Sequence, residues 1–361
     1  MQISKILRML PLAGLVIALV GVPGALAQGG EAPEQVVVEH AGLFPEGIEW
    51  DAARGQFLLG SIAEGTIFSV QDDGTIAPFI ENDQLMASIG LHIDPAADRL
   101  LVANNNPAVF QGPVTDGPVA TLMAFDLESG EELFYADFSD LVEGGQHFAN
   151  DVTVDADGNA YVTDSFAPVI FKVTPDGTPS VFLEDEQFAG EGFNLNGIEY
   201  HPDGYLIVAK SSTGQLFKVP VDSPEDAGEV MLDTPVNGAD GIVLRDDGTL
   251  FVVGSPQSVF AVQSTDGWES ASVASTAQVD DQPTTAALRD GEAYVIFAKL
   301  SQQGSDPLPE TFEIVHVPFE DLETMSSMMT PEADMAMTEA VPMDMATEVA
   351  PMEAAATEAA G

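Results

Sequence analysis

Short runs of alternating apolar and polar residues, separated by Asp-Gly turns, cover the chain from about residue 35 to residue 320. The runs 160–164, 206–210 and 250–254 are typical, and the first two follow the turns Asp157-Gly158 and Asp203-Gly204. A period of two residues predicts strands with one buried face, and Asp-Gly favours tight turns between strands. Because helical periodicity is absent from this part of the sequence, we predict an all-β fold.

The strand pattern is organised in six repeats. Each repeat begins with a similar six-residue segment, and these segments lie at 46–51, 89–94, 150–155, 196–201, 240–245 and, more weakly, 285–290. Successive starts are 43, 61, 46, 44 and 45 residues apart, and further short strands follow each start. Four short strands repeated at this spacing are typical of a propeller blade. We therefore predict a six-bladed β-propeller with four-stranded blades around a central channel.

Two segments lie outside the regular repeats. The first would close the predicted ring, and the second is an insertion. The run Val36-Val37-Val38 precedes the first repeat and would supply the outer strand of the last blade. The longest interval, between the starts at 89 and 150, contains an Asn-, Pro- and Gly-rich stretch from Asn104 to Gly117. We expect this insertion to be a loop over one face of the ring.

The N-terminal end of the sequence predicts export. Lys5 and Arg8 precede the apolar run 9–22, and Ala25-Leu26-Ala27 follows as a small-residue cleavage pattern. An uncleaved membrane anchor is the alternative, although a spanning helix needs about 20 apolar residues. We expect residues 1–27 to be a signal peptide and the mature protein to be secreted or periplasmic, with no membrane span after cleavage.

The C-terminal end differs in composition from the repeats. Residues 325–361 are rich in Met, Ala and acids and contain no Lys, Arg or aromatic residue. Such a stretch buries too little apolar area to offset the entropy of ordering, so we expect a disordered tail. The propeller is then expected to occupy residues 28–324, as a monomer.

Composition narrows the classes of partner. The chain has 59 acids and 10 bases, a net charge of −49, which excludes a nucleic-acid partner because phosphates are bound by Lys and Arg clusters. Zero Cys excludes disulfides and thiolate metal sites. A hydrophobic content of 45% with 20 Phe indicates a real core, in which we expect the aromatic residues to lie. Repulsion at this charge density is relieved by salt or by bound cations.

Four of the six repeats start with an oxygen-bearing side chain, namely Glu46, Asn150, Asn196 and Asp240. Equivalent positions of a propeller converge on its channel, so two carboxylates and two amide oxygens would meet there. Hard oxygen ligands suit Ca²⁺, and other divalent cations are also compatible. The alternative is that Asn and Asp simply form turns, which explains four residues in register less well.

These motifs resemble the calcium-dependent six-bladed propellers of the gluconolactonase/regucalcin family, to which paraoxonases and diisopropyl fluorophosphatase are more distantly similar. The matching segments are Pro45-Glu46-Gly47, Asn150-Asp151-Val152, Asn196-Gly197-Ile198 and Asp240-Gly241-Ile242. The resemblance implies that Glu46, Asn150, Asn196 and Asp240 hold a catalytic calcium whose open face polarises the carbonyl of a lactone or ester, or a phosphoryl oxygen. The second and sixth repeats, which start with Ile89 and with Thr284-Thr285, depart from the family pattern.

Two residues are candidates for the proton-transfer step. Asp240 is the first, as a base or nucleophile that also binds metal. His147, three residues before Asn150, is the second, although a surface-loop histidine is an alternative interpretation.

Two functions follow from these observations. The first is an exported calcium-dependent hydrolase of lactones or related esters, acting on a small molecule. The alternative is a non-catalytic exported propeller that keeps calcium for structure and binds a partner on one face.

Overall fold

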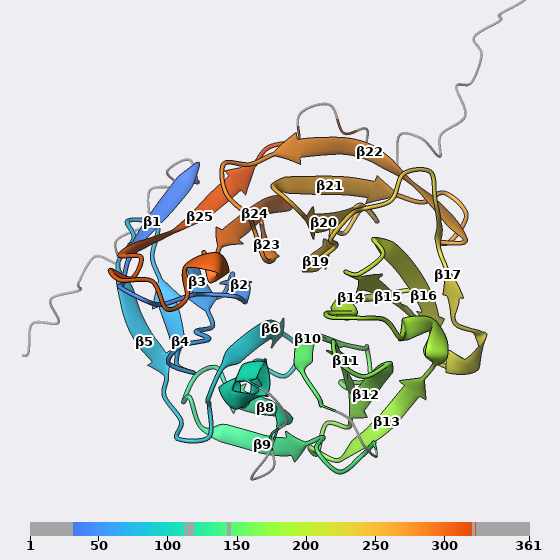
Figure 1. Cartoon of the computed structure of the whole chain (residues 1–361), viewed down its shortest axis with the longest axis horizontal. Helices are drawn as coiled ribbons and strands as arrows, with labels where there is room; N and C mark the ends of the chain where they lie inside the picture. The colour runs from blue at the N-terminus through green and yellow to red at the C-terminus, as the bar shows by residue number, and fades with distance from the viewer. Residues whose placement is uncertain (1–31, 112–113, 115–118, 143–145, 320–321, 323–361) are drawn as a thin grey trace, which may run out of the picture.

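The computed structural model describes residues 32–111, 114, 119–142, 146–319 and 322. The predicted signal peptide (1–27) and the predicted tail (325–361) lie outside the described residues, and both stay predictions. Six sheets surround a central axis, with the strand at each predicted repeat start innermost (Figure 1). This arrangement confirms the predicted six-bladed β-propeller.

The first four blades are antiparallel meanders in which consecutive strands are neighbours. Blade 1 contains β2 (Ile48–Asp51), β3 (Gln56–Leu59), β4 (Ile67–Val70) and β5 (Ile76–Ile80). Blade 2 contains β6 (Ser88–Asp94), β7 (Arg99–Asn105), β8 (Ala120–Asp126) and β9 (Glu132–Asp137). Blade 3 contains β10 (Ala149–Val154), β11 (Ala160–Asp164), β12 (Val169–Val173) and β13 (Pro179–Glu184). Blade 4 contains β14 (Leu195–His201), β15 (Tyr205–Lys210), β16 (Gln215–Pro220) and β17 (Gly228–Glu229).

The last two blades each contain a strand from outside the simple meander. Blade 5 contains β19 (Ile242–Leu244), β20 (Leu250–Gly254), β21 (Ser258–Gln263) and β22 (Ser270–Gln278), with β18 (Met231–Leu232) parallel to β22. Blade 6 contains β23 (Ala286–Arg289), β24 (Glu292–Phe297), β25 (Thr311–Val317) and, from the start of the described chain, β1 (Gln35–Glu39). β1 pairs antiparallel with β25, with Val36 opposite Ile314. The predicted ring closure is confirmed.

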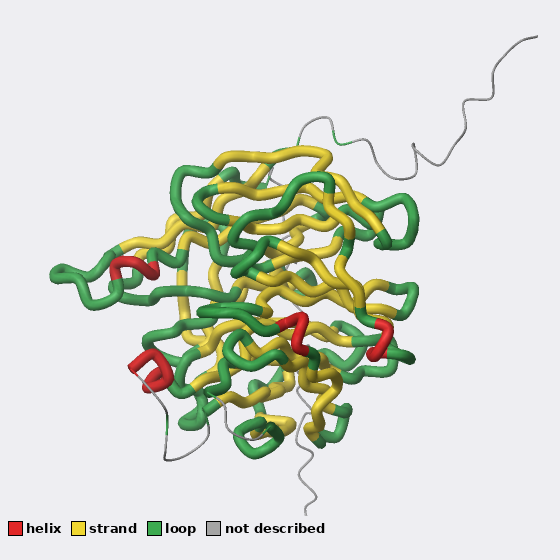
Figure 2. Tube along the Cα trace, turned by 45° about the vertical axis from the view of Figure 1, so that its right-hand side comes forward, coloured by secondary structure: helices red, strands yellow, loops and turns green. Residues whose placement is uncertain are grey.

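Helical structure in the described residues is limited to short 3-10 turns, as the tube in Figure 2 shows. They are η1 (Pro107–Gln111), η2 (Glu186–Phe188), η3 (Pro224–Asp226) and η4 (Leu300–Gln302). Within this part of the chain, no helix has the length and apolar character needed to cross a membrane.

The hydrophobic core lies between neighbouring blades, because both faces of each blade are apolar near the centre of its strands. Leu58 of blade 1, for example, shares one cluster with Leu100 and Val102 of blade 2. Phe138, which follows blade 2, stacks on Phe171 of blade 3 with ring centroids 4.4 Å apart. Burial of such side chains stabilises the ring by roughly 2 kcal/mol each and fixes each blade against the next.

The prediction of a loop from Asn104 to Gly117 is wrong at its start. Asn104 and Asn105 end β7 and are fully buried. The Asn105 amide accepts a hydrogen bond from the backbone N–H of Ala149 (2.9 Å) and donates one to the carbonyl of the same residue (2.7 Å). These bonds tie the end of β7 to the start of blade 3, so the side chain extends the strand instead of forming a turn.

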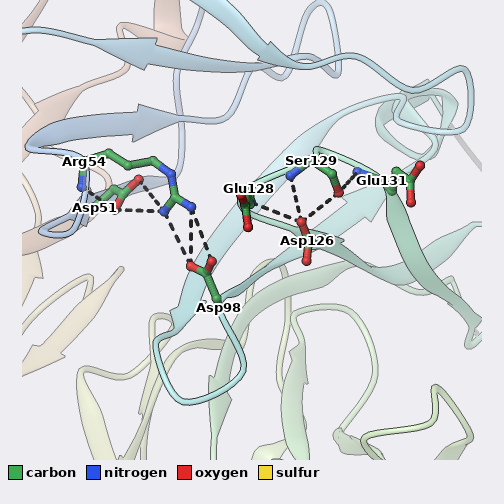
Figure 3. A network of polar contacts seen from close by, with 7 residues as sticks. All are labelled: Asp51, Arg54, Asp98, Asp126, Glu128, Ser129 and Glu131. Carbon is green, nitrogen blue, oxygen red and sulfur yellow. Dashed lines mark hydrogen bonds and ion pairs between the residues drawn. The ribbon is translucent and has the colours of Figure 1, made fainter. Parts of the chain in front are cut away.

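Two arginines join neighbouring blades at turns between strands. The Arg54 guanidinium lies between Asp51 of its own blade, at 3.2 Å, and Asp98 of blade 2, at 3.4 Å (Figure 3). Arg289 of blade 6 pairs in the same way with Asp72 of blade 1 at 2.6 Å. In a chain with so few bases, this placement offsets repulsion between blades.

Candidate functional site

The four predicted ligands lie together around a cavity of about 410 Å³ at one end of the central channel. Glu46, Asn150 and Asn196 are buried, and Asp240 is half-buried. The Asn196 amide donates a hydrogen bond to a carboxylate oxygen of Asp240 at 2.7 Å. We call these four residues the quartet. The structure therefore brings together the four blade starts that the repeat alignment singled out.

Irregular pairing of two first strands directs the side chains of Asn150 and Asn196 toward the cavity. The pairing of β10 with β11 shifts register between Ala149 and Val152, and the pairing of β14 with β15 shifts between Leu195 and Ile198. A bulge of this kind changes the direction of the side chains within it. Asn150 and Asn196 lie inside these two bulges and line the cavity.

A glycine after the quartet residue lets neighbouring first strands touch. A Cβ atom on Gly47 would lie 2.0 Å from the carbonyl oxygen of Ile89, and one on Gly197 would lie 2.6 Å from the backbone nitrogen of Ile242. No side chain fits at such distances. The close approach of adjacent blades at these points brings residues from separate repeats to one centre.

Two serines fix the orientation of the amide ligands. The Ser165 hydroxyl donates to the carbonyl of Leu195 at 2.6 Å, so its oxygen accepts from the Asn150 amide N–H at 2.9 Å. Ser211 likewise donates to a backbone carbonyl and accepts from the Asn196 amide N–H at 3.0 Å. Because a hydroxyl has a single proton to give, each asparagine must present its N–H to the serine. The amide oxygen then stays free to bind a cation.

The quartet carries unbalanced negative charge. Burial, the nearby carboxyl of Asp240 and that of Asp151 together hold the pKa of Glu46 well above its usual range. Burial also raises the pKa of Asp240, although the hydrogen bond from Asn196 opposes this effect. Among the described residues that line the cavity, none is a Lys, Arg or His. A bound cation would relieve the repulsion that these shifts express.

The donor set fits a hard divalent cation. Two carboxylates and two oriented amide oxygens are the ligand types that Ca²⁺ prefers. In the described part of the chain, no group of three or more His, Cys, Asp or Glu side chains gathers in a way that would hold a metal. A cation at the quartet would therefore depend on the amide oxygens as well as on the acids, which makes their orientation by serine important.

A narrower cavity of about 30 Å³ continues from the quartet along the channel. Asp151, Glu49, Glu199 and His92 line it. Burial raises the pKa of Asp151 to about 7 and that of Glu49 to about 8, and lowers the pKa of His92 to about 4. The space holds about one water molecule. Of the two cavities that the quartet borders, the larger one alone has room for a small-molecule substrate.

The structure places His147 away from the cavity. Its ring is 1% exposed, and its Nδ1 lies 2.6 Å from a carboxylate oxygen of Asp164. Asp164 also accepts hydrogen bonds from the backbone N–H groups of Phe148, Phe166 and Ala167. This network ties the loop before β10 to the end of β11. His147 is thus a buried residue of the segment before β10 and pairs with Asp164, whereas Asp240 lines the cavity directly.

The two blade starts that depart from the family pattern make contacts beside the quartet instead of supplying a ligand. Ile89 is 1% exposed and packs in the cluster that contains Ile62, Val109 and Phe148. The Thr284 hydroxyl of blade 6 donates to the backbone carbonyl of Glu46 at 3.0 Å. Blade 2 therefore supplies an apolar wall beside the quartet, and blade 6 holds the backbone of one ligand.

The two orienting serines, Ser165 and Ser211, were not predicted, although the sequence carries a signal for them in a serine that recurs in four blades. A serine occurs fifteen residues after each quartet residue, at Ser61, Ser165, Ser211 and Ser255. The interval spans the first strand, its turn and the second strand, so the serine returns to the level of the ligand. A search for polar residues at matched positions of the second strands would have found them.

Known structures share this fold. The major allergen Mala s 1 of Malassezia sympodialis matches with a TM-score of 0.68 at 19% identity, over 79% of this chain and 96% of that one. A structure described as a calcium-binding protein, regucalcin, from Agrobacterium tumefaciens matches with a TM-score of 0.55 at 19% identity, over 79% and 94%. A gluconolactonase from Xanthomonas campestris matches with a TM-score of 0.53 at 13% identity, over 79% and 89%.

The family assignment depends on a sequence match and not on these distant structures. No curated protein matches the chain. The family model described as SMP-30/Gluconolactonase/LRE-like region matches residues 44–295, which contain the whole quartet. This match confirms the resemblance inferred from the four motifs, and the chain belongs to the SMP-30/gluconolactonase/LRE-like family.

Proposed function

We propose that this protein is an exported calcium-dependent hydrolase of lactones or related esters. Membership of a family that includes gluconolactonases supports a lactonase-type hydrolase. The observation that carries the proposal is the convergence of Glu46, Asn150, Asn196 and Asp240 on the floor of one cavity. Two acids and two oriented amides at this position form a cation site that faces a space large enough for a small molecule.

The residues around the cavity would divide the work as follows. Glu46, Asn150, Asn196 and Asp240 would hold Ca²⁺, which when bound supplies a Lewis acid for the carbonyl of the substrate. Ser165 and Ser211 keep the two amide oxygens turned toward the cation. A carbonyl oxygen placed at the quartet would leave the rest of the substrate in the larger cavity, because the narrow one has no room for it.

Asp240 is our choice for the proton-transfer residue. Its carboxyl lines the cavity, and burial raises its pKa toward neutrality, where a carboxylate becomes a better base. Asp240 would take a proton from the attacking water and return it to the leaving oxygen. His147 ranks second, because its ring lies under the loop and its Nδ1 is committed to Asp164.

The test is a panel of lactones and aryl esters assayed with the purified chain, with and without EGTA. We expect turnover that EGTA abolishes and that added Ca²⁺ restores. Silence on every substrate, in a protein that calcium still stabilises, would favour the non-catalytic binding module instead.

Export is tested separately. Mass spectrometry of the protein recovered outside the cytoplasm of a bacterial host should give an N-terminus near Gln28, as the cleavage pattern Ala25-Leu26-Ala27 predicts. A protein retained in the membrane with residues 1–27 attached would contradict this part of the proposal.

A further inference from the structure

The wall of the cavity above the quartet is apolar and largely aromatic. Its apolar lining consists of Ile62, Ile89, Phe110, Phe148, Phe193 and Leu300. These side chains come from five different blades or their connecting loops, including the short helices η1 and η4. Separate parts of the chain thus contribute apolar side chains to one wall of the cavity.

The phenylalanines form one connected cluster. The ring centroid of Phe148 lies 5.4 Å from that of Phe110, 5.4 Å from that of Phe166 and 5.6 Å from that of Phe193. Phe166 also packs against Phe193 at 5.0 Å. These spacings are typical of tilted and edge-to-face contacts. The cluster therefore holds the rings at the mouth in defined positions.

Two rings of the cluster are exposed at the mouth. Phe110 is 48% exposed and Phe193 is 43% exposed, whereas Phe148 between them is buried. Exposed aromatic side chains around a concave site would be covered by an apolar ligand. The hydrophobic effect would then favour substrates that carry apolar groups.

The polar part of the cavity gives no means of binding an anionic substrate. The charged residues in its lining are Glu46 and Asp240, and no basic side chain accompanies them among the described lining residues. A carboxylate or phosphate on the substrate would find no partner beyond the cation itself. Sugar hydroxyls placed against the phenylalanine side chains would lose water without hydrogen bonds from those side chains in return.

We propose that the site takes neutral lactones or esters with an alkyl or aryl substituent, and that Phe110, Phe148 and Phe193 bind this substituent. This inference rests on the proposed function and names its substrate class. The phenylalanine wall disfavours polyhydroxylated lactones, and the lack of a basic side chain in the described lining disfavours lactones that carry an acidic group.

The first test compares three substrates in calcium with the full chain: δ-valerolactone, δ-decalactone, which adds a five-carbon chain, and glucono-1,5-lactone. Each buried methylene should raise kcat/KM about threefold, so δ-decalactone should exceed δ-valerolactone by at least tenfold. Glucono-1,5-lactone should be the poorest of the three. Turnover of glucono-1,5-lactone equal to or above that of δ-decalactone would overturn the inference.

The second test is the variant Phe193→Ala. It should lower kcat/KM for δ-decalactone at least tenfold, mainly through KM, and change kcat/KM for δ-valerolactone less than threefold. Leu133→Ala, which removes an exposed apolar side chain from the outer strand β9, is the matched control and should change neither. Equal losses on both substrates, or no loss on either, would contradict a role in binding the substituent.

A binding measurement separates this inference from the proposed function. N-phenyl-1-naphthylamine, a neutral apolar fluorophore, should bind the chain and be displaced by δ-decalactone, and Phe193→Ala should weaken its binding at least tenfold. If no lactone or ester is hydrolysed but this binding is seen, the proposed function fails and the apolar site stands. If hydrolysis is seen but the fluorophore does not bind, the inference fails and the function stands.

Discussion

Blades 1, 3, 4 and 5 place an oxygen ligand at the channel and a serine fifteen residues later, at the end of the second strand. Blade 2 has Ile89 and Asn104 at these two positions, and blade 6 has Thr285 and Leu300. In the first group the four ligands form the candidate cation site, and Ser165 and Ser211 orient its two amides. In the other two blades, Ile89 and Leu300 line the apolar cavity, while Asn104 bonds to the backbone N–H of Met86 at 2.7 Å.

The difference shows how one repeat serves two purposes. Every blade has the same backbone, so a side chain at the blade start reaches the same channel in all six. Four blades have a polar group at this position that would bind a cation. The other two have Ile89 and Thr285 there, which form part of the surroundings of the cation site. The repeated backbone therefore allows an asymmetric site, with ligands from four blades and apolar side chains at the matched positions of the other two.

The change with the largest expected effect is Asp240→Asn in blade 5. It keeps an oxygen ligand of similar size but removes a negative charge and the proposed base, so turnover at saturating calcium should fall by about two orders of magnitude or more. Steady-state kinetics over a calcium titration checks this. Asp246→Asn removes the same charge from an exposed turn and should leave turnover unchanged.

Three outcomes would revise the assignment of Asp240. If saturating calcium restores most of the turnover of Asp240→Asn, the residue only binds metal. If Asn196→Asp, which adds a charge and leaves Asp240 in place, loses as much activity, charge balance is the cause. If His147→Ala abolishes turnover while Asp240→Asn does not, the ranking of the two bases is wrong.

Removal of calcium should destabilise the fold. A ligand at a hundredfold excess over its Kd stabilises the native state by about 3 kcal/mol, which corresponds to a melting temperature higher by roughly 5 °C for a domain of this size. Differential scanning calorimetry with and without EGTA, at low ionic strength, measures this shift. An unchanged melting temperature would mean that the four ligand blades do not bind calcium.

Loss of an orienting serine should weaken calcium binding. Ser211→Ala removes the partner of the Asn196 amide, and the loss of such a supporting hydrogen bond typically lowers metal affinity about 10- to 100-fold. Isothermal titration calorimetry checks the Kd. Ser212→Ala is the control, since the neighbouring hydroxyl bonds to Asn194 and not to the quartet. Equal effects of the two changes would argue against a specific role for Ser211.

Calcium affinity should fall as the pH falls. Burial raises the pKa of Asp240 to about 7 and holds that of Glu46 well above its usual range. Below pH 7 protons compete with the cation for these groups, so the apparent Kd should increase about tenfold or more between pH 8 and pH 6. A flat profile over this range would show that the acids are already ionised in the free protein.

The smallest expected effect lies at the outer turn that joins a ligand blade to an apolar blade. Asp98→Asn breaks the link between Arg54 and Asp98 and leaves the pair of Arg54 with buried Asp51 in place, and an exposed ion pair contributes only about 0–1 kcal/mol. Chemical denaturation should show a loss of this size, together with an unchanged calcium Kd. A change in calcium affinity would mean that the seam between blades 1 and 2 affects the quartet.

The repeat and the quartet were predictable because both depend on register. A spacing near 45 residues fixes the blades, and residues at the same place in each repeat must meet at the axis. The phenylalanine wall was not predictable in this way. Phe148 lies two residues before its quartet residue and Phe193 three before its own, while Phe110 comes from an insertion. The expectation that aromatic residues lie in the core is wrong for Phe110 and Phe193, since both are exposed at the mouth.

His147 shows a second limit of the sequence. Its position near Asn150 indicates a place by the channel mouth, but its partner Asp164 lies at the end of the next strand. A hydrogen bond between those two residues depends on how the loop before β10 folds back. Proximity along the chain therefore predicted the neighbourhood of the residue but not its contacts.

The pairing of β1 with β25 sets the order in which the protein can be completed. A ribosome makes β1 first and β25 last, so the closing strand has no partner until the sixth blade has been synthesised. Until then Val36 and Val38, which are buried in the finished ring, are part of an open apolar strand edge. Such edges promote aggregation. Translation products that stop before β25 should therefore be insoluble, even when all the residues of the quartet are present.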